Sequence, residues 1–291
     1  MSTWSNYVLA KNIHEALEAL GNAPGPARPV AGGTDLLLEL QQGRHGSIHT
    51  LVDITNIPEL NCLELRQDSL FIGAAVPVRE ITLSALVLEH ARAVSEACGL
   101  IGGPQVRNTA SLGGNVAHAL PAADGMIALC ACNAMAEIAG RDGVRREPIL
   151  SLFRGPGQSA LDMEHEFLVG FYLPLRQTGQ ACAFARIMRP QGVALPILNM
   201  AAWLERSDKR IQDVRLVVGP SGPVPQRAVV VEQALRGCEY GPEALQQAKS
   251  ALRSSLHFRS NPQRASAEYR YELSEVLLDT VMAEAWARAE V

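Results

Sequence analysis

The stretch from residue 102 to residue 124 constrains the fold of this chain more than any other part of the sequence. It reads GGPQVRNTASLGGNVAHALPAAD, so it holds two glycine pairs and ends in a Pro-x-x-Asp run at Asp124. Paired glycines allow positive φ and let the backbone approach a ligand closely, and successive amides in such a turn suit an anion. Thr109, Ser111 and Asn115 add short polar side chains beside those amides. A tight turn without a ligand explains the same residues equally well.

Another glycine pair lies near the N-terminus, in the segment VAGGTDLLLEL. The pattern predicts that a buried strand ends at Ala31, that Gly32 and Gly33 form a turn, and that Thr34 or Asp35 caps a helix. A strand, a glycine turn and a helix N-terminus together form an anion site, because free amides and the helix dipole face the turn. A strand–turn–helix corner with no ligand has the same residues, and the glycine pair alone does not exclude it.

Two amide-rich turns suit a diphosphate, because its two charged groups can be held from opposite sides. Neither turn is a Walker A loop, since no Gly-Lys-Ser/Thr follows either of them. Neither matches the Gly-x-Gly-x-x-Gly run of a Rossmann unit. The turns therefore indicate a dinucleotide cofactor whose identity the spacing does not settle.

Hydrophobic periodicity and turn residues divide the chain into elements, and its length predicts about two domains. Three strands followed by helices after residue 180 indicate an α+β domain. Asn261 and Pro262 are expected to open the last helix as cap and first-turn proline. The expected helices are 12–20, 78–98, 124–132, 149–157, 229–236, 242–257 and 262–289; the expected strands are 50–54, 62–66, 69–76, 134–140, 143–148, 166–174, 181–188, 195–206 and 211–220.

Charge and composition exclude several classes of function. The net charge of −4 and the absence of any basic run argue against nucleic acid as a partner. No window is apolar enough for a membrane span, and the N-terminus lacks the pattern of a signal peptide. The six cysteines, at 62, 98, 130, 132, 182 and 238, lack the spacing of a metal site and predict reduced thiols in a cytoplasmic protein. The seven histidines form no metal-binding or catalytic constellation, so neither a metal site nor a catalytic residue is expected in this chain.

Five segments, in order along the whole chain, resemble one family. They are VAGGTDLLLEL, GPQVRNTASLGGNVAHALPAAD, EFLVGFYLP, GPVPQRAVVVEQALRG and ASAEYRYEL. The chain resembles the FAD-binding medium subunits of molybdenum hydroxylases, which include those of carbon monoxide, xanthine and nicotinate dehydrogenases. Five segments that match the family in the same order identify it far more specifically than any one segment does.

The resemblance implies a fold and a set of cofactor contacts. The implied fold is α+β, with a vanillyl-alcohol oxidase (PCMH) type FAD-binding domain of two α/β subdomains, 1–55 and 56–176. A C-terminal domain, 177–291, carries a three-stranded antiparallel sheet and helices. FAD would lie between the two subdomains. Two backbone segments would hold its pyrophosphate, Asp124 would form a hydrogen bond with the cofactor, and apolar side chains would pack around the flavin. The implied cofactor-binding residues are Val30, Ala31, Gly32, Gly33, Thr34, Asp35, Leu36, Ile101, Thr109, Ser111, Leu112, Gly113, Gly114, Asn115, Asp124, Leu168 and Arg186.

The sequence departs from the family pattern near the flavin ring. Many relatives carry Phe-Lys and a later Asp there, whereas Ala185 follows Phe184 here and Val193 stands at the Asp position. Arg186 and Arg189 are expected to supply positive charge instead. These replacements leave open whether NAD+ is the electron acceptor. The Cys-rich insert that binds a [4Fe–4S] cluster in some relatives is absent.

The resemblance implies an electron-relay subunit. A small subunit would carry two [2Fe–2S] clusters, a large subunit would carry the molybdenum cofactor and oxidise substrate, and this chain would hold FAD. Two alternatives remain at this point. One is a stand-alone flavin-dependent oxidoreductase of the same fold, and the other is a scaffold that has lost FAD, against which the intact glycine pairs and Asp124 argue.

Overall fold

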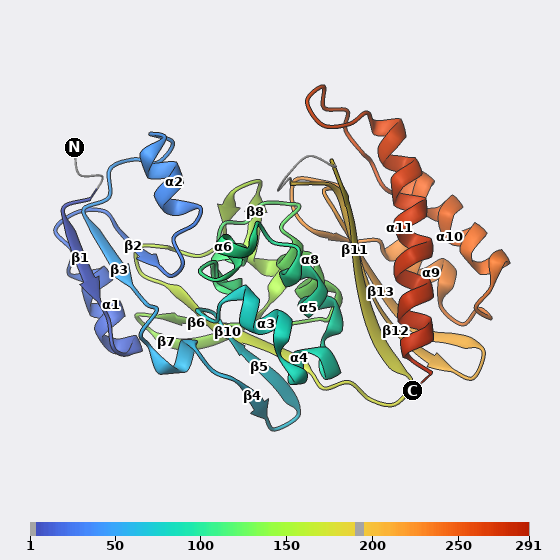
Figure 1. Ribbon diagram of the computed structural model, residues 1–291, viewed down its shortest axis with the longest axis horizontal. Helices are drawn as coiled ribbons and strands as arrows, with labels where there is room; N and C mark the ends of the chain where they lie inside the picture. Colours follow the sequence, from blue (N-terminus) through green and yellow to red (C-terminus); the bar gives the residue numbers. More distant parts are fainter. Residues whose placement is uncertain (1–3, 190–194, 291) are drawn as a thin grey trace.

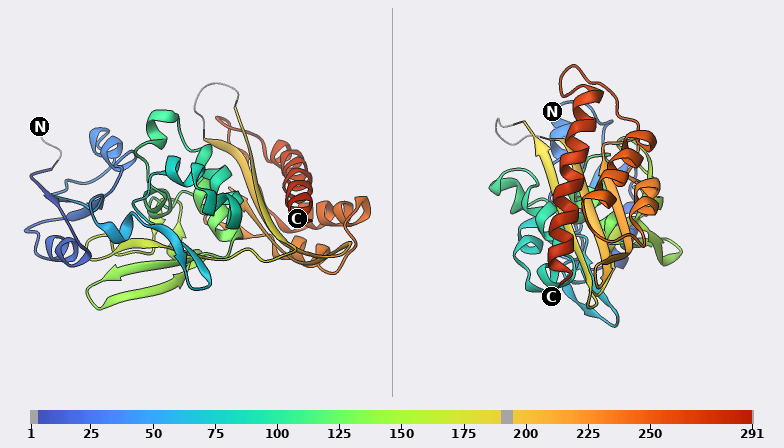
Figure 2. Two further views of the ribbon diagram at one scale, coloured as in Figure 1. Left: turned by 60° about the horizontal axis from the view of Figure 1, so that its bottom comes forward. Right: turned by 90° about the vertical axis from the view of Figure 1, so that its right-hand side faces the viewer.

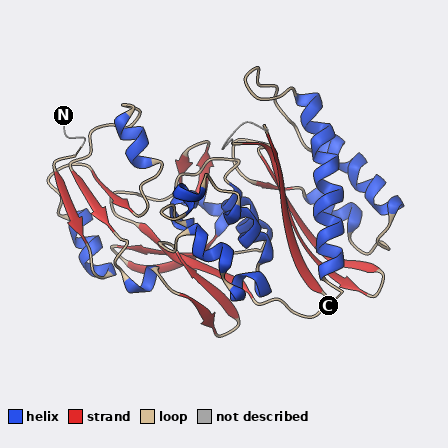
Figure 3. Cartoon of the chain, in the orientation of Figure 1, coloured by secondary structure: helices blue, strands red, loops and turns tan. Residues whose placement is uncertain are grey.

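Three β-sheets follow one another along the long axis of the molecule (Figure 1). The computed structural model describes residues 4–189 and 195–290. In strand order the sheets are β1-β3-β2, β4-β5-β10-β6-β7 and β11-β12-β13-β14, and β8 and β9 form a small separate pair. Helices fill the space between the sheets and cover the C-terminal end, which confirms the predicted α+β class (Figure 3).

The first sheet is parallel, and its central strand is buried. Leu51 and Val52 of that strand are 1% and 0% exposed, as expected for a parallel sheet covered on both faces. The helix that follows the first strand is capped by Asn12, whose side chain accepts a 2.8 Å hydrogen bond from the amide of Glu15. The elements are β1 (Asn6–Leu9), α1 (Ile13–Gly21), β2 (Ala27–Val30), α2 (Leu36–Gln41) and β3 (Thr50–Asp53). Strand β1 is short and was not expected from the sequence.

The second sheet is antiparallel throughout. The expected strands over 62–66 and 69–76 pair as one hairpin in it, and those over 134–140 and 143–148 pair as another. The middle strand of the sheet carries a bulge between Leu168 and Gly170. A Cβ at Gly170 would lie 2.3 Å from the ring of Phe71, so only glycine fits there. The strands are β4 (Leu63–Arg66), β5 (Ser69–Gly73), β6 (Met135–Gly140), β7 (Gly143–Pro148) and β10 (Phe167–Pro174).

Short helices cover one face of this sheet, and residues 78–98 are mostly helical, as expected, although two breaks that the sequence did not predict divide the segment. Ser84 takes an extended conformation and caps a new helix by accepting a hydrogen bond from the amide of Val87, and Ala91 breaks the chain again at φ −145°. The expected helix over 149–157 is a 3-10 turn followed by a short strand. The elements are η1 (Pro58–Leu60), α3 (Val78–Leu83), α4 (Ala85–His90), α5 (Arg92–Gly99), α6 (Pro104–Arg107), α7 (Leu112–Ala117), α8 (Asp124–Ala131), η2 (Ile149–Leu152), β8 (Phe153–Gly155) and β9 (Gln158–Ser159).

The third sheet contains the three predicted antiparallel strands and one short additional strand, β14. The last helix begins after Ser266, which accepts a hydrogen bond from the amide of Tyr269, and not at Asn261 and Pro262. Asn261 instead pairs with Ala265 in a turn. The elements are β11 (Gln180–Met188), β12 (Pro196–Ser207), β13 (Arg210–Gly219), β14 (Gln226–Arg227), α9 (Val229–Leu235), α10 (Pro242–Ser255) and α11 (Ala267–Arg288).

Both faces of the third sheet are buried. One face packs against α9, α10 and α11 at the end of the molecule (Figure 2). The other face packs against α5 and α8, and it contributes Cys182, Phe184, Ala201 and Val217 to the core of the central part. Side chains alternate across a strand with a period of two, so alternate residues of each strand belong to different cores.

Candidate functional site

The first glycine loop leaves the carboxyl end of strand β2, where ligands bind in many open α/β sheets. Gly33 lies at φ +64°, a conformation that favours glycine. Within the described part of the chain, the amides of residues 32–36 donate no intramolecular hydrogen bond. Asp35 precedes α2 but makes no capping bond, so the predicted capping role of its side chain is wrong. The loop therefore presents a row of free donors.

The second glycine loop lies against the first one. A Cβ added to Gly32 would lie 2.0 Å from the carbonyl oxygen of Thr109 and 3.0 Å from the Cα of Ala110. The two backbones thus approach as closely as atoms allow, and only glycine permits it. His118 adds a second link, with Nε2 3.7 Å from an oxygen of Glu39. The structure brings together the two segments that the sequence singled out.

Most amides of the second loop are already used, which corrects the expectation that this backbone offers a second row of free donors. The loop is the start of helix α7, and Ser111 caps it by accepting a 3.1 Å hydrogen bond from the amide of Gly114. The amide of Gly113 donates to Ala74 O at 2.9 Å, and that of Asn115 donates to Ser111 O at 3.1 Å. The second loop therefore forms part of the wall of the candidate site, whereas the first loop supplies its free amide donors.

Asp124 lies at the start of helix α8, buried against the third sheet. Its carboxylate forms an ion pair with Arg186 of β11 and accepts a 2.7 Å hydrogen bond from Nδ2 of Asn199 on β12. The side chains of Asp124 and Arg186 are only 5% and 7% exposed. Burial raises the pKa of Asp124, and Arg186 and Asn199 oppose that shift. The carboxylate is therefore held by two groups of the C-terminal sheet.

Three buried polar atoms around this carboxylate have no hydrogen-bond partner among the described residues. They are Asn115 Oδ1, Arg186 Nε and Asn199 Oδ1. Buried polar atoms nearly always have a partner, and exceptions gather at functional sites. Of the three residues, Asn115 is partly exposed, so its Oδ1 is available to a ligand beside Asp124, and a diphosphate fits the free amides of the first loop. FAD has both a diphosphate and further hydrogen-bonding groups.

The structure also places the remaining predicted contact residues. The side chains of Leu168 and Leu112 are 3% and 0% exposed and belong to the core, and the predicted contact of Leu112, in the second loop, is through its backbone. The guanidinium of Arg189 donates to the carbonyl oxygen of Gln263, away from Asp124. Ile101 is partly exposed and remains available. Val193 lies outside the described residues.

The sequence reasoning missed Asn199 and His118. Asn199 is fully buried in a strand whose other residues are mainly apolar. It lies two and four residues before Ala201 and Trp203, so the three side chains share the sheet face toward α8, and this spacing is the signal that could have identified it. A buried amide in an apolar strand requires partners. His118 carried no comparable signal, because its contact with Glu39 depends on the meeting of the two loops.

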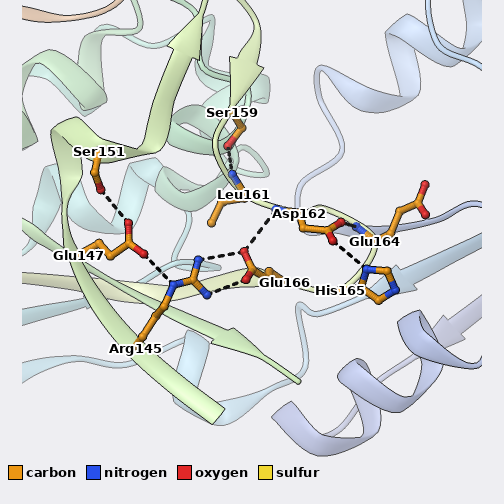
Figure 4. A network of polar contacts seen from close by, with 9 residues as sticks. All are labelled: Arg145, Glu147, Ser151, Ser159, Leu161, Asp162, Glu164, His165 and Glu166. Atoms are coloured by element: carbon orange, nitrogen blue, oxygen red, sulfur yellow. Dashed lines mark hydrogen bonds and ion pairs between the residues drawn. The ribbon is translucent and has the colours of Figure 1, made fainter. Parts of the chain in front are cut away.

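A larger polar network lies on the hairpin of the central sheet (Figure 4). Arg145 holds both oxygens of Glu166, at 2.7 and 3.0 Å, and also contacts Glu147. The bond from Arg145, and a second from Ser151, lower the pKa of Glu147. The arginine side chain is 42% exposed, and exposed pairs of this kind contribute little. The network fastens the hairpin to the loop before β10 and is separate from the glycine loops.

Residues 4–189 and 195–290 contain neither a metal-binding cluster nor a membrane-spanning helix. No three His, Cys, Asp or Glu side chains in these ranges are placed to hold a metal ion. No helix in them is both long and apolar enough to cross a bilayer.

Two family descriptions match the chain. The FAD binding domain in molybdopterin dehydrogenase matches residues 3–176, and the CO dehydrogenase flavoprotein C-terminal domain matches residues 183–285. Together they cover nearly the whole sequence.

Individual relatives are similar over the full length. The chain is 30% identical over 293 residues to the xanthine dehydrogenase FAD-binding subunit of Escherichia coli O157:H7, which covers 99% of this chain and 98% of the relative. It is 32% identical over 283 residues to the nicotine 6-hydroxylase medium subunit of Paenarthrobacter nicotinovorans, with 97% of each covered. A chain of the carbon monoxide dehydrogenase structure from Hydrogenophaga pseudoflava superposes with a TM-score of 0.91 at 27% identity, covering 98% of both chains.

Proposed function

The chain belongs to the family of FAD-binding subunits of molybdenum hydroxylases, and we propose that it works as the electron-relay subunit of such an enzyme. Bound FAD supplies the ability to accept electrons and pass them on. The protein supplies binding, orientation and electrostatics. The observation that carries the proposal is the backbone contact between Gly32 and Thr109, which joins the two glycine loops beside a row of free amides.

The proposed contacts follow from the atoms that remain available. The amides of residues 32–36 would hold the diphosphate, because they have no other partner among the described residues. Thr109, Gly114 and Ile101 would line the cofactor, since each is exposed or partly exposed beside the loops. Asp124 would accept a hydrogen bond from the cofactor. Arg186, which the sequence suggested as a free cation, would act mainly by balancing the charge of Asp124.

We place the [2Fe–2S] clusters on a small partner subunit and the molybdenum cofactor on a large one. Relatives named medium subunit or medium chain support a place between a smaller and a larger partner. The six cysteines are all free, which supports a location in the reducing cytoplasm.

The test is purification of the tagged full-length chain from its native host, followed by flavin and metal analysis. We expect yellow protein that contains FAD and copurifies with two other subunits, one with iron and one with molybdenum. Failure of the purified chain to bind added FAD would overturn the proposal. FAD-loaded chain that purifies alone and is reduced directly by small organic substrates would instead indicate a stand-alone flavin oxidoreductase.

Replacing Gly114 by valine is expected to weaken FAD binding without unfolding the protein. Gly114 is exposed, and an added Cβ would meet only Ser111 Oγ, at 3.2 Å. A side chain there projects from the loop toward the proposed cofactor, and the loss of a close approach of this kind costs about 1–3 kcal/mol. Titration of FAD by fluorescence quenching measures the effect, and the melting temperature of the cofactor-free protein should stay close to that of the wild type.

Gly46→Val is the matched control, because no atom lies within 4 Å of the Cβ position at Gly46 and this residue belongs to the connection between α2 and β3, outside both loops. It should leave FAD affinity unchanged. Unchanged FAD affinity in Gly114→Val would remove this residue from the proposed site.

A further inference from the structure

The carboxylate of Asp124 lies against a row of three residues that runs across the strands of the third sheet. Arg186, Asn199 and Gly219 are direct cross-strand neighbours on β11, β12 and β13. Side chains at paired positions share one face of a sheet. The row therefore faces helix α8 as a unit.

Each member of the row contacts the segment around Asp124. Arg186 pairs with the carboxylate, and Asn199 donates to it at 2.7 Å and to Ala122 O at 3.1 Å. A Cβ on Gly219 would lie 2.7 Å from the carbonyl oxygen of Pro121, so glycine is required for this close approach. The three strands thus fix both the backbone and the side chain of the segment.

Burial makes these contacts strong. Asn199 is 0% exposed and Asp124 is 4% exposed, so water does not compete for the carboxylate. A hydrogen bond to a buried charged group is stronger than a neutral one. The second carboxylate oxygen is held by Arg186, so the two donors together determine where the carboxylate points.

We propose that Asn199 is a positioning residue of the flavin site, which acts from the C-terminal sheet by orienting the carboxylate of Asp124 toward FAD. Asn199 has no exposed surface, so we expect its effect on the cofactor to pass through Asp124. The C-terminal domain thereby sets the affinity of a cofactor bound by the other two parts of the chain. This inference rests on the proposed function, because it assumes that Asp124 contacts FAD.

A double-mutant cycle tests the inference on the full-length chain. Asn199→Leu removes both donations at similar volume, and we expect the dissociation constant for FAD to rise by about tenfold. In an Asp124→Asn background the same change should have a much smaller effect on FAD binding than in the wild type, because the carboxylate that Asn199 orients is absent and the bond to Ala122 O is the main contact left to lose. The visible circular dichroism of bound flavin should change in Asn199→Leu and in Asp124→Asn, since both alter the group beside the cofactor.

Ser274→Ala is the matched control. Ser274 is also 0% exposed in the C-terminal domain, and its hydroxyl donates to Tyr271 O at 2.7 Å in a helix on the far side of the sheet. It should change neither FAD affinity nor the flavin spectrum. If Asn199→Leu does not fold, Asn199→Asp keeps the shape, replaces the donor by an acceptor and is expected to weaken FAD binding as well.

The outcomes separate the two claims. Additive effects of Asn199→Leu and Asp124→Asn on FAD binding would overturn the positioning role while leaving the proposed function intact. Wild-type protein that binds no FAD would overturn the proposed function itself.

Discussion

Replacing Gly32 by alanine is expected to abolish retention of FAD and to destabilise the protein by about 1–3 kcal/mol. The added Cβ would lie 2.0 Å from Thr109 O and 2.6 Å from its carbonyl carbon, which are backbone atoms that no rotamer change can move. The loops must separate to relieve the clash, and the free amides of the first loop then move away from the diphosphate position. Flavin content after gel filtration and the denaturant midpoint of the cofactor-free chain measure the two effects.

Gly46→Ala provides the comparison, because its Cβ would meet no atom within 4 Å. It should retain FAD and wild-type stability. A Gly32→Ala protein that keeps its flavin and its stability would show that the two loops do not approach each other in solution as they do in the structure.

Replacing Arg186 by methionine is expected to destabilise the folded protein by about 3–5 kcal/mol at neutral pH. The substitution leaves the Asp124 carboxylate buried without its counterion, and both side chains are less than a tenth exposed. The pKa of Asp124, already raised by burial, rises further when the opposing charge is lost. Urea unfolding at a series of pH values measures the penalty.

The sign of the pH dependence follows from that raised pKa. When the pKa of Asp124 is higher in the folded state than in the unfolded state, protonation favours the folded protein. The loss of stability caused by Arg186→Met is therefore smallest in acid and grows as pH rises through the folded-state pKa of Asp124 in the variant. Cys98 is the other titratable group near Asp124, and burial raises its pKa out of this range. The double substitution Arg186→Met with Asp124→Asn should recover much of the stability and lose the pH dependence. A flat pH profile for Arg186→Met alone would contradict a buried ion pair at this position.

Local patterns in the sequence predicted most of the elements that position the site. Alternation identified β11, β12 and β13, and the glycine pairs with their flanking polar residues identified both loops. These signals are local. The alternation of side chains along a strand and the conformational freedom of glycine both depend on only a few consecutive residues. The breaks at Ser84 and Ala91 were missed, since an apolar period of three to four residues continues across them.

The parts that sequence did not predict depend on contacts between distant segments. The spacing suggested that both loops offer free amides, but Ala74 O and the cap at Ser111 occupy those of the second loop. Arg186 was expected to act as a free cation, and its pairing with Asp124 becomes visible only when β11 is placed beside α8. The sequence reasoning did not single out Asn199, and the partners of its buried amide become visible only when β12 is placed beside α8.

The third sheet, with both faces buried, bears on how this molecule moves. Relative motion of neighbouring domains is expected unless their interface is large and hydrophobic, and here Phe184, Ala201 and Val217 join the core of the central part. Opening a hinge between β11 and α8 would expose that apolar layer and also separate Arg186 from Asp124. Slow closure of the C-terminal domain over the central part, of the kind that limits turnover in many enzymes, is therefore not expected here. The central part and the third sheet should move as one rigid body.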